Sequence, residues 1–238
     1  MTKLTEPLYL PGANEPMGVL PWGKSPEQTK SDLAAVVARV GGNRPPNYGQ
    51  TYLLAANTLL TTAQAGGVLD HHGLPIFFMQ RHAAELMIKD ALLLGIEVQK
   101  YRKKLHIPSP AFPNSNQINR AEGCHDLDVL FCDLADMAKA LQAGPVPKAL
   151  HAVIGEIRKV EQREPSWSRY SFHKEGPKEA KTRHAHLQEE ITIPLGKIQN
   201  LLQTANDNLG TIWPFNGSLI GMLGSQLEPL LRQAGEIE

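Results

Sequence analysis

Apolar residues recur with helical spacing along most of this chain, and no stretch of useful length alternates as a β-strand would. The segment 74–98 is apolar almost all the way round, which is typical of a buried helix. Five polar side chains lie in its middle: Arg81, His82, Glu85, Lys89 and Asp90. Because an unpaired buried ion costs several kcal/mol, we expect these side chains to have polar partners. Glu85 precedes Lys89 by four residues, which is the favourable order for an ion pair on a helix.

Six further segments show the same spacing together with helix start or stop signals. They cover approximately residues 25–40, 48–64, 125–142, 147–162, 187–205 (interrupted by Pro194) and 218–233. Ser25 followed by Pro26 is typical of a helix start, and Gly41 with Gly42 is typical of a helix end. Residues 107–119 are rich in Pro and Asn, so we expect a loop that leads up to Arg120. Residues 163–186 are predicted to form a long polar loop.

These segments predict an all-α fold, a bundle of six to seven helices with helix 74–98 at its centre and helix 125–142 beside it. A chain of 238 residues is long enough to bury a substantial core, and we expect a single domain over residues 25–238. Residues 1–24 contain four prolines and three glycines. They are predicted to form an extended N-terminal arm.

Charge and composition limit the partners of this chain. Lys and Arg together number 24, as do Asp and Glu, so no global field attracts nucleic acid and any such binding needs a local patch. One segment has that character, with four basic residues close together: Lys100, Arg102, Lys103 and Lys104. They form a candidate RNA-facing patch, or else a solvated helix end whose cations complement the helix dipole.

The sequence predicts a soluble, cytoplasmic protein without metal or cofactor. The two cysteines, Cys124 and Cys132, show no disulfide or zinc pattern, and residues 1–12 lack the layout of a signal peptide. The charges within 74–98 argue against a membrane span. Glu122 and His125 have the spacing of one helical metal-ligand pair, but no second copy accompanies it, so no metal site is expected.

Three polar motifs follow one another along the chain. They are Arg81-His82 with Glu85 and Lys89, then His125-Asp126, and then Arg169-Tyr170. In this order they resemble a bacterial branch of the HEPN superfamily, which comprises all-helical domains of nucleotide-binding and ribonuclease type. The resemblance covers about residues 70–175. An Arg followed by a His after four to six residues also marks that superfamily, and Arg120 precedes His125 by five.

The resemblance implies cleavage of RNA without a metal ion. Histidine, with an ordinary pKa near 6.5, moves protons readily at neutral pH, and a guanidinium stabilises charge on a phosphoryl group. His125 would then be the general acid or base, with Arg120 and Arg169 as phosphate clamps. The remaining matched residues would form a polar network around them: Arg81, His82, Glu85, Lys89, Asp126 and Tyr170.

Other interpretations of these residues remain open. His125-Asp126 also suits a helix N-cap, and Arg169 with Tyr170 suits a loop anchor. At the level of function, the resemblance implies an RNA-targeting effector of a prokaryotic antiphage defence or toxin system, acting as a homodimer. The alternative is a non-catalytic HEPN-like module that binds a nucleotide, or a partner protein from the same operon, within a larger complex.

Overall fold

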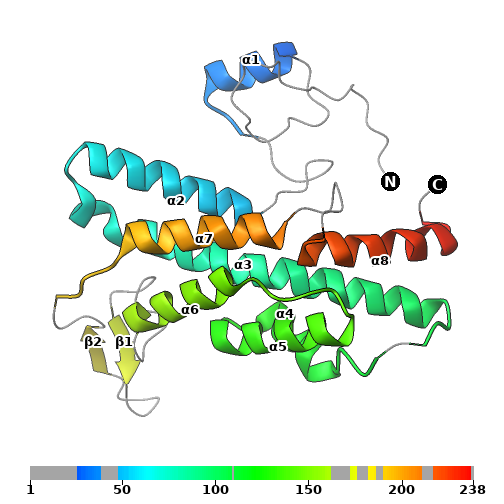
Figure 1. Ribbon diagram of the computed structural model, residues 1–238. Coiled ribbons are helices and arrows are strands. Elements are labelled where there is room, and N and C mark those ends of the chain that lie inside the picture. The colour runs from blue at the N-terminus through cyan, green and yellow to red at the C-terminus, as the bar shows by residue number, and fades with distance from the viewer. Residues whose placement is uncertain are drawn as a thin grey trace. The chain divides into compact units, whose positions relative to one another are not determined.

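The computed structural model describes residues 26–38, 48–108, 110–161, 172–175, 182–185, 190–210 and 217–236 (Figure 1). The chain divides into two compact units, residues 1–47 and residues 48–238. Sequence alone placed a boundary at residue 24, between the arm and the bundle, and that boundary stays a prediction. The arm itself, residues 1–24, lies outside the described residues.

In the first unit the structure describes one helix, α1 (Pro26–Ala35). It is shorter than the predicted helix of about 25–40. Val36 adopts a positive φ of 55°, and the amide of Val37 donates to the carbonyl of Asp32 at 3.0 Å. A left-handed residue with this hydrogen bond is a common way for a helix to end. The chain therefore leaves the helix before the Gly41-Gly42 pair.

The second unit contains the other seven described helices. They are α2 (Tyr48–Ala65), α3 (Leu69–Lys104), α4 (Ser115–Gly123), α5 (Leu127–Ala140), α6 (Lys148–Glu161), α7 (Leu195–Leu209) and α8 (Leu219–Gln233). Two short strands, β1 (Phe172–Glu175) and β2 (Thr182–Ala185), pair in antiparallel fashion, with Phe172 opposite Ala185. The all-α prediction is confirmed for the bundle. The β1–β2 pair lies inside the predicted irregular loop of 163–186, which is wrong at those eight positions.

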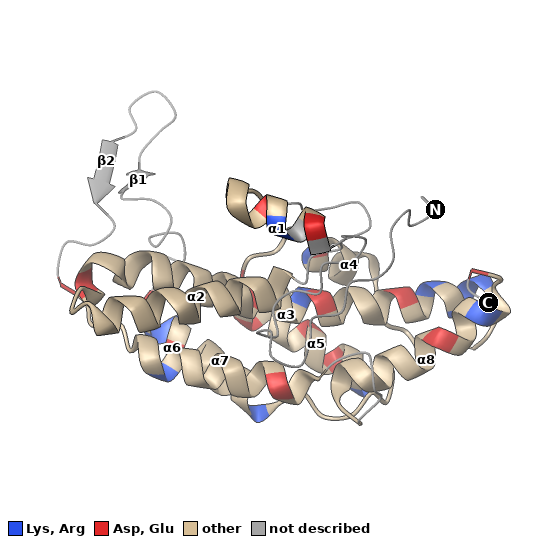
Figure 2. Ribbon diagram, turned by 90° about the horizontal axis from the view of Figure 1, so that it is seen from above, with Lys and Arg blue, Asp and Glu red and all other residues tan. Residues whose placement is uncertain are grey.

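Helix α3 forms the centre of this unit, as predicted. It packs against α2, α4, α5, α6, α7 and α8, and Figure 2 shows it lengthwise among them. Ile76, Phe77, Ile88 and Leu92 on α3 are almost completely buried. Because α3 is covered on several sides, its apolar residues extend all round the helix rather than along one stripe.

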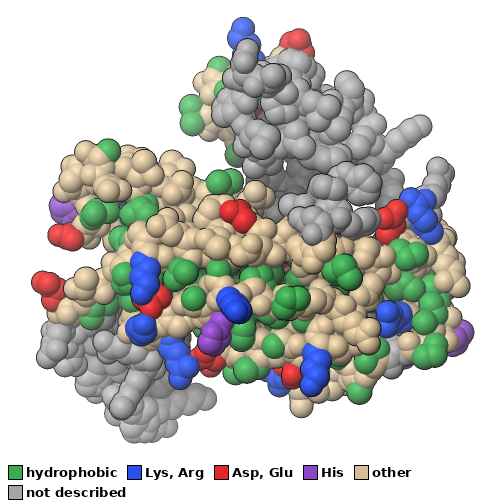
Figure 3. Space-filling view, viewed as in Figure 1, with side chains coloured by type: hydrophobic (Ala, Val, Ile, Leu, Met, Phe, Trp, Pro, Cys, Tyr) green, Lys and Arg blue, Asp and Glu red, His purple; other side chains and the backbone are tan. Residues whose placement is uncertain are grey.

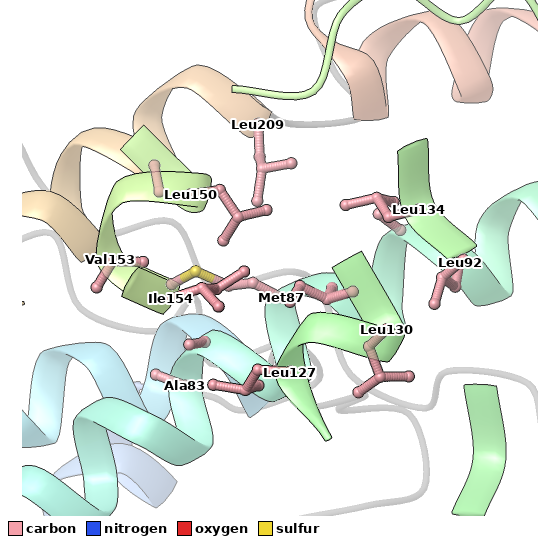
Figure 4. Close-up of a cluster of buried hydrophobic side chains, with 14 of the residues drawn as sticks. Ala83, Met87, Leu92, Leu127, Leu130, Leu134, Leu150, Val153, Ile154 and Leu209 are labelled. Atoms are coloured by element: carbon pink, nitrogen blue, oxygen red, sulfur yellow. The ribbon is translucent and has the colours of Figure 1, made fainter. Parts of the chain in front are cut away.

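Helix α5 packs beside α3, also as predicted, and contributes a regular apolar stripe to the core. Leu127, Leu130, Leu134 and Met137 are buried, and Figure 4 shows the three leucines facing side chains of α3 and α6. Ile154 on α6 closes the same cluster. This packing brings the start of α5 to the middle of α3, where the polar residues of α3 lie.

Helix α3 is longer than predicted, because it begins at Leu69 and passes through Pro75. Proline is best tolerated in a first turn, which favoured a start near residue 74. In the structure Pro75 is the seventh residue of the helix. At the other end the helix continues to Lys104, six residues beyond the predicted end.

Helix α4 is missing from the prediction, which gave a loop over residues 107–119. Its start is a capping box: the Asn114 side chain accepts from the amide of Gln117, and the Gln117 side chain accepts from the amide of Asn114, both at 3.0 Å. Such reciprocal bonds satisfy two amides that a helix start otherwise leaves unpaired. Arg120 consequently lies on a helix and not at the end of a loop.

Helix α7 begins at Leu195 rather than near residue 187. Pro194 is its N-cap, and the residue before a proline disfavours helical backbone, so residues 190–194 remain outside the helix. Helix α8 begins after Ser218, whose side chain accepts from the amide of Gly221 at 3.2 Å. Among the described helices, none combines the length and the apolar character that crossing a membrane requires.

Candidate functional site

Glu85, in the middle of α3, is the centre of a buried polar network. One of its carboxylate oxygens, Oε1, accepts from Lys89 Nζ at 3.0 Å and from His125 Nδ1 at 2.8 Å. The other, Oε2, accepts from the Arg81 guanidinium. Glu85 and Arg81 are each only 3% exposed. The expectation that the charges of this helix have internal partners is confirmed for these three α3 residues, whereas Asp90 faces outward.

Arg81 connects three parts of the chain through its three nitrogens. Nε donates to Glu161 Oε1 on α6 at 2.7 Å, and Nη1 donates to Glu85 on α3. Nη2 donates to the backbone carbonyl of His125, in the connection between α4 and α5, at 2.5 Å. The planar guanidinium suits such directed bonding, since its donors point in fixed directions. Arg81 thereby fixes the backbone on which His125 stands.

The network keeps the Glu85 carboxylate ionised. Burial by itself raises the pKa of Glu85, but hydrogen bonds from Lys89, His125 and Arg81 outweigh it and lower the pKa from 4.5 to about 2. For Arg81, burial opposes the charged form, yet the carboxylates of Glu161 and Glu85 raise its pKa above its ordinary value. The site therefore holds full charges in a buried place, each matched by a partner of opposite sign.

An ionised Glu85 determines how the His125 ring is protonated. A carboxylate accepts hydrogen bonds and cannot donate them, so the contact between Oε1 and Nδ1 requires a proton on Nδ1. In the neutral ring Nε2 is then the unprotonated nitrogen. The His125 side chain is 56% exposed, so a ligand in solvent has access to it. A buried carboxylate that orients an exposed histidine is the arrangement expected of a general base.

A pocket of about 200 Å³ lies beside His125. It is bounded by α3, by the connection before α5, and by α5 and α6, with the lining residues Arg81, His125, Asp126, Leu127, Asp128, Ile154, Arg158 and Glu161. Two of the lining residues, Arg158 and Asp128, pair with each other, with Nη1 at 3.2 Å from Oδ2. The lining therefore contains both acidic and basic groups.

Asp126 is the N-cap of α5, which confirms the capping interpretation. Its Oδ1 accepts from the amides of Asp128 and Val129 at 2.9 and 3.1 Å. The cap ends the connection that carries His125 and so helps to fix the position of the ring. Arg169 and Tyr170 lie outside the described residues, and their predicted roles stay predictions.

Arg120 is engaged in a second ion pair. Its Nε and Nη2 donate to the two carboxylate oxygens of Asp133 on α5, at 2.7 and 2.6 Å, and Gln117 Nε2 approaches the same carboxylate at 3.4 Å. Asp133 is buried, so this two-pronged contact joins α4 to α5. This contact uses two of the three guanidinium nitrogens of Arg120, and its role as a phosphate clamp stays a prediction.

His82 lies among aromatic rings. Its ring makes an edge contact with Tyr52 on α2, with 4.6 Å between centroids, and stacks on Phe78 with 5.7 Å between centroids. These contacts direct the ring toward α2. They also give the half-buried imidazole an apolar setting of the kind found in helix packing.

The predicted RNA-facing patch lies far along α3 from the pocket. Lys100 is fifteen residues beyond Glu85 and Lys104 nineteen, which amounts to about 22 and 28 Å along the helix axis. Lys100 pairs with Glu97, Lys104 pairs with Glu236, and Arg102 donates to Gln226 at 3.2 Å. Figure 3 shows basic and acidic side chains in small mixed groups on one face of the protein, in keeping with the balanced charge.

Sequence reasoning missed the acidic partners of the site. Glu161 and Asp133 each interrupt an apolar stripe, one turn beyond Ile157 in α6 and three residues beyond Leu130 in α5. A charged residue within an apolar stripe is also the feature that drew attention to Glu85. The same criterion, applied to α5 and α6, would have identified Asp133 and Glu161. Within the described residues, no group of three or more His, Cys, Asp or Glu side chains is placed to hold a metal ion.

Comparisons with models of protein families, with curated proteins and with solved structures find no match to this chain. The geometry of the site and the motifs of the sequence therefore carry the functional argument.

Proposed function

We propose that this protein is a HEPN-like RNA-targeting effector, an endoribonuclease that needs no metal ion. The observation that carries the proposal is the His125–Glu85 pair beside a pocket lined by guanidinium groups. An exposed imidazole, a buried carboxylate at its Nδ1 and nearby cations are the components that metal-free cleavage of a phosphodiester requires.

In the proposed reaction His125 Nε2 removes the proton from a ribose 2′-hydroxyl. The 2′ oxygen forms a bond to phosphorus, the bond from phosphorus to the 5′ oxygen breaks, and solvent water supplies the proton that the 5′ oxygen takes up. The products are a 2′,3′-cyclic phosphate end and a 5′-hydroxyl end. Glu85 keeps the proton on Nδ1 and stabilises the imidazolium that forms.

The first prediction is that His125→Asn abolishes cleavage and leaves the fold intact. An asparagine amide donates to Glu85 much as Nδ1 does, but it has no group that takes up a proton at neutral pH. The full chain is incubated with labelled total RNA and with tRNA in the presence of a chelator. We expect cyclic-phosphate ends from the parent and none from the variant, with melting temperatures within a few degrees.

The matched control is His71→Ala, which removes an exposed histidine near the start of α3. It should cut RNA at the parental rate. Cleavage by His125→Asn at that rate would overturn the assignment of His125. RNA left intact by the parent, with the chain folded, would overturn the nuclease proposal in favour of the following alternative.

The second candidate function is a non-catalytic HEPN-like module that binds a nucleotide or a partner protein. This function is favoured because the motif residues already have hydrogen-bond partners inside the protein. All three nitrogens of Arg81 and both oxygens of Glu85 bond within it. On this proposal the motif maintains the fold. Replacing Glu85 would then destabilise the protein, and RNA would stay intact under every condition.

The wider setting is proposed from the resemblance. It comprises a cytoplasmic protein of a prokaryotic antiphage defence or toxin system, which forms a homodimer and is controlled by a partner from the same operon. In this setting RNA or a nucleotide is the ligand, and no metal or cofactor takes part.

A further inference from the structure

The proposed nuclease needs a cation that binds the phosphate next to His125, and most of the nearby cations are occupied. Arg81 is 3% exposed and uses all three nitrogens inside the protein. Lys89 is 10% exposed and pairs with Glu85. Arg120 holds the buried Asp133 through two bonds. Releasing any of these would leave a buried carboxylate without its partner, which is costly.

Arg158 differs from these residues in exposure and in how it is held. It stands on α6, lines the same pocket as His125, and its side chain is 70% exposed. Its ion pair with Asp128 joins one nitrogen to one oxygen at 3.2 Å, and the Asp128 side chain is 50% exposed. Exposed pairs of this kind contribute little to stability, so the guanidinium exchanges partners readily.

We propose that Arg158 is the phosphate-binding residue of this pocket and that Asp128 occupies its guanidinium until a phosphodiester takes its place. This assignment rests on the proposed function and gives it a substrate contact absent from the sequence motifs. A phosphate offers two oxygens to the guanidinium fork, and such two-pronged, charge-assisted contacts are roughly twice as strong as neutral hydrogen bonds. The other carboxylates at the pocket are already engaged, Glu161 by Arg81 and Asp126 by the backbone of α5.

The size of the pocket indicates which part of an RNA it takes. Its volume of about 200 Å³ lies below the roughly 300–1,000 Å³ of sites for drug-sized ligands. A phosphate with its adjoining sugar fits such a space better than a whole nucleotide. The substrate class is therefore the ribose-phosphate backbone of an RNA strand, with little reading of the base.

The experiment measures anion binding apart from cleavage. Inorganic phosphate is titrated into the full chain at constant ionic strength, and the ring protons of His125 are followed by NMR. We expect a saturable shift in the parent and about tenfold weaker binding in Arg158→Gln, from the loss of charge-assisted hydrogen bonds. Asp128→Asn should bind phosphate about two- to fivefold more tightly, because it removes the competing carboxylate.

The matched control is Lys159→Gln. Lys159 is an equally exposed cation on the same helix, and it pairs with Glu156 away from the pocket. It should bind phosphate as the parent does. Equal weakening in Lys159→Gln and Arg158→Gln, no saturable shift in the parent, or weaker binding in Asp128→Asn would each overturn the assignment.

The two proposals fail in different ways. If phosphate binds through Arg158 while RNA stays intact, the nuclease proposal is lost and the anion site stands. If Arg158→Gln cuts RNA with parental kcat and KM, the nuclease stands and Arg158 is not its phosphate contact. Arg158→Lys keeps the charge without the fork, so the proposal expects it to bind phosphate with an affinity between those of the parent and Arg158→Gln.

Discussion

At the scale of single residues, Glu85 connects the stability of the fold to the geometry of the site. The same carboxylate neutralises two buried cations and orients His125. Breaking a buried ion pair by removing one partner costs about 3–5 kcal/mol, because the other charge is left uncompensated. A change at Glu85 therefore acts on folding and on any chemistry at His125 together, and assays must separate the two.

Glu85 should make the stability of the protein depend on pH in the acidic range. Its pKa of about 2 in the folded protein lies below its ordinary value of 4.5, so the unfolded chain takes up the proton first as the pH falls. The stabilisation, about 3 kcal/mol, is complete above pH 4.5 and is lost as the pH falls toward 2. Urea unfolding of the parent and of Glu85→Gln should differ by that amount at neutral pH and converge near pH 2.

A matched control for this measurement is Glu97→Gln on the same helix. Glu97 is 42% exposed and pairs with Lys100 at the surface, so its loss should change the free energy of unfolding by less than about 1 kcal/mol. A difference between parent and Glu85→Gln that stays constant from neutral pH to pH 2 would contradict the role given to the Glu85 charge.

The sequence indicated which residues of α3 need partners but not which partners they have. Burial of Arg81, Glu85 and Lys89 follows from the apolar residues around them, which are visible in the sequence. The partner Glu161 lies 80 positions beyond Arg81. Contacts over such separations depend on how helices pack, and local spacing carries no information about them.

At the scale of secondary structure elements, α3 and α5 are in tight contact at Gly95. A Cβ atom placed on Gly95 would lie 2.6 Å from the Sδ atom and 2.8 Å from the Cγ atom of Met137, whose side chain is fully buried. Glycine at this position therefore sets the distance between the two helices. It also lets α5 bring its first turn, with Asp126 as the cap, to the site.

Gly95→Ala should destabilise the protein, whereas Gly73→Ala should not. At Gly95 the new methyl group overlaps Met137, and overpacking of a core costs about 1–3 kcal/mol. At Gly73, in the same helix, nothing lies within 4 Å of the new atom, and alanine is favoured over glycine in a helix by about 0.5–1 kcal/mol. Chemical denaturation of both variants gives the two values.

Gly95→Ala should lower the free energy of unfolding, and Gly73→Ala should raise it. If both variants shift the free energy of unfolding in the same direction, the close approach at Gly95 does not limit the packing. Combining Gly95→Ala with Met137→Ala should cost less than the sum of the single changes, since removal of the Met137 sulfur relieves the overlap.

Element boundaries were predicted well where apolar spacing and capping agree, and poorly where only one is present. The helices α2, α6 and α8 match the predicted ranges within a residue at each end. The sequence of α4 has few apolar residues, so its capping box at Asn114 was the only strong signal. For α3, burial by surrounding helices outweighs the local cost of Pro75, an effect that no local rule contains.

At the scale of the whole molecule, the sequence predicted an all-α bundle around one central helix, and the unit of residues 48–238 has that architecture. Its main apolar core extends from Leu53 to Leu230. The site combines residues from α3, from the connection before α5, and from α6. The motifs named His125 and Glu85, whereas the place of Arg158 and Glu161 beside His125 depends on how α6 packs.

The central place of α3 has a consequence for the order in which parts of this unit open to solvent. Backbone amides of the buried stretch around Ala83–Leu92 lie beneath surrounding helices, so they should exchange with deuterium only when the bundle unfolds as a whole. His125 instead sits on a short connection, which opens at a smaller cost in free energy. We therefore expect slow exchange around the carboxylate of the pair and faster exchange around the imidazole, so that the pair can separate while the bundle stays folded.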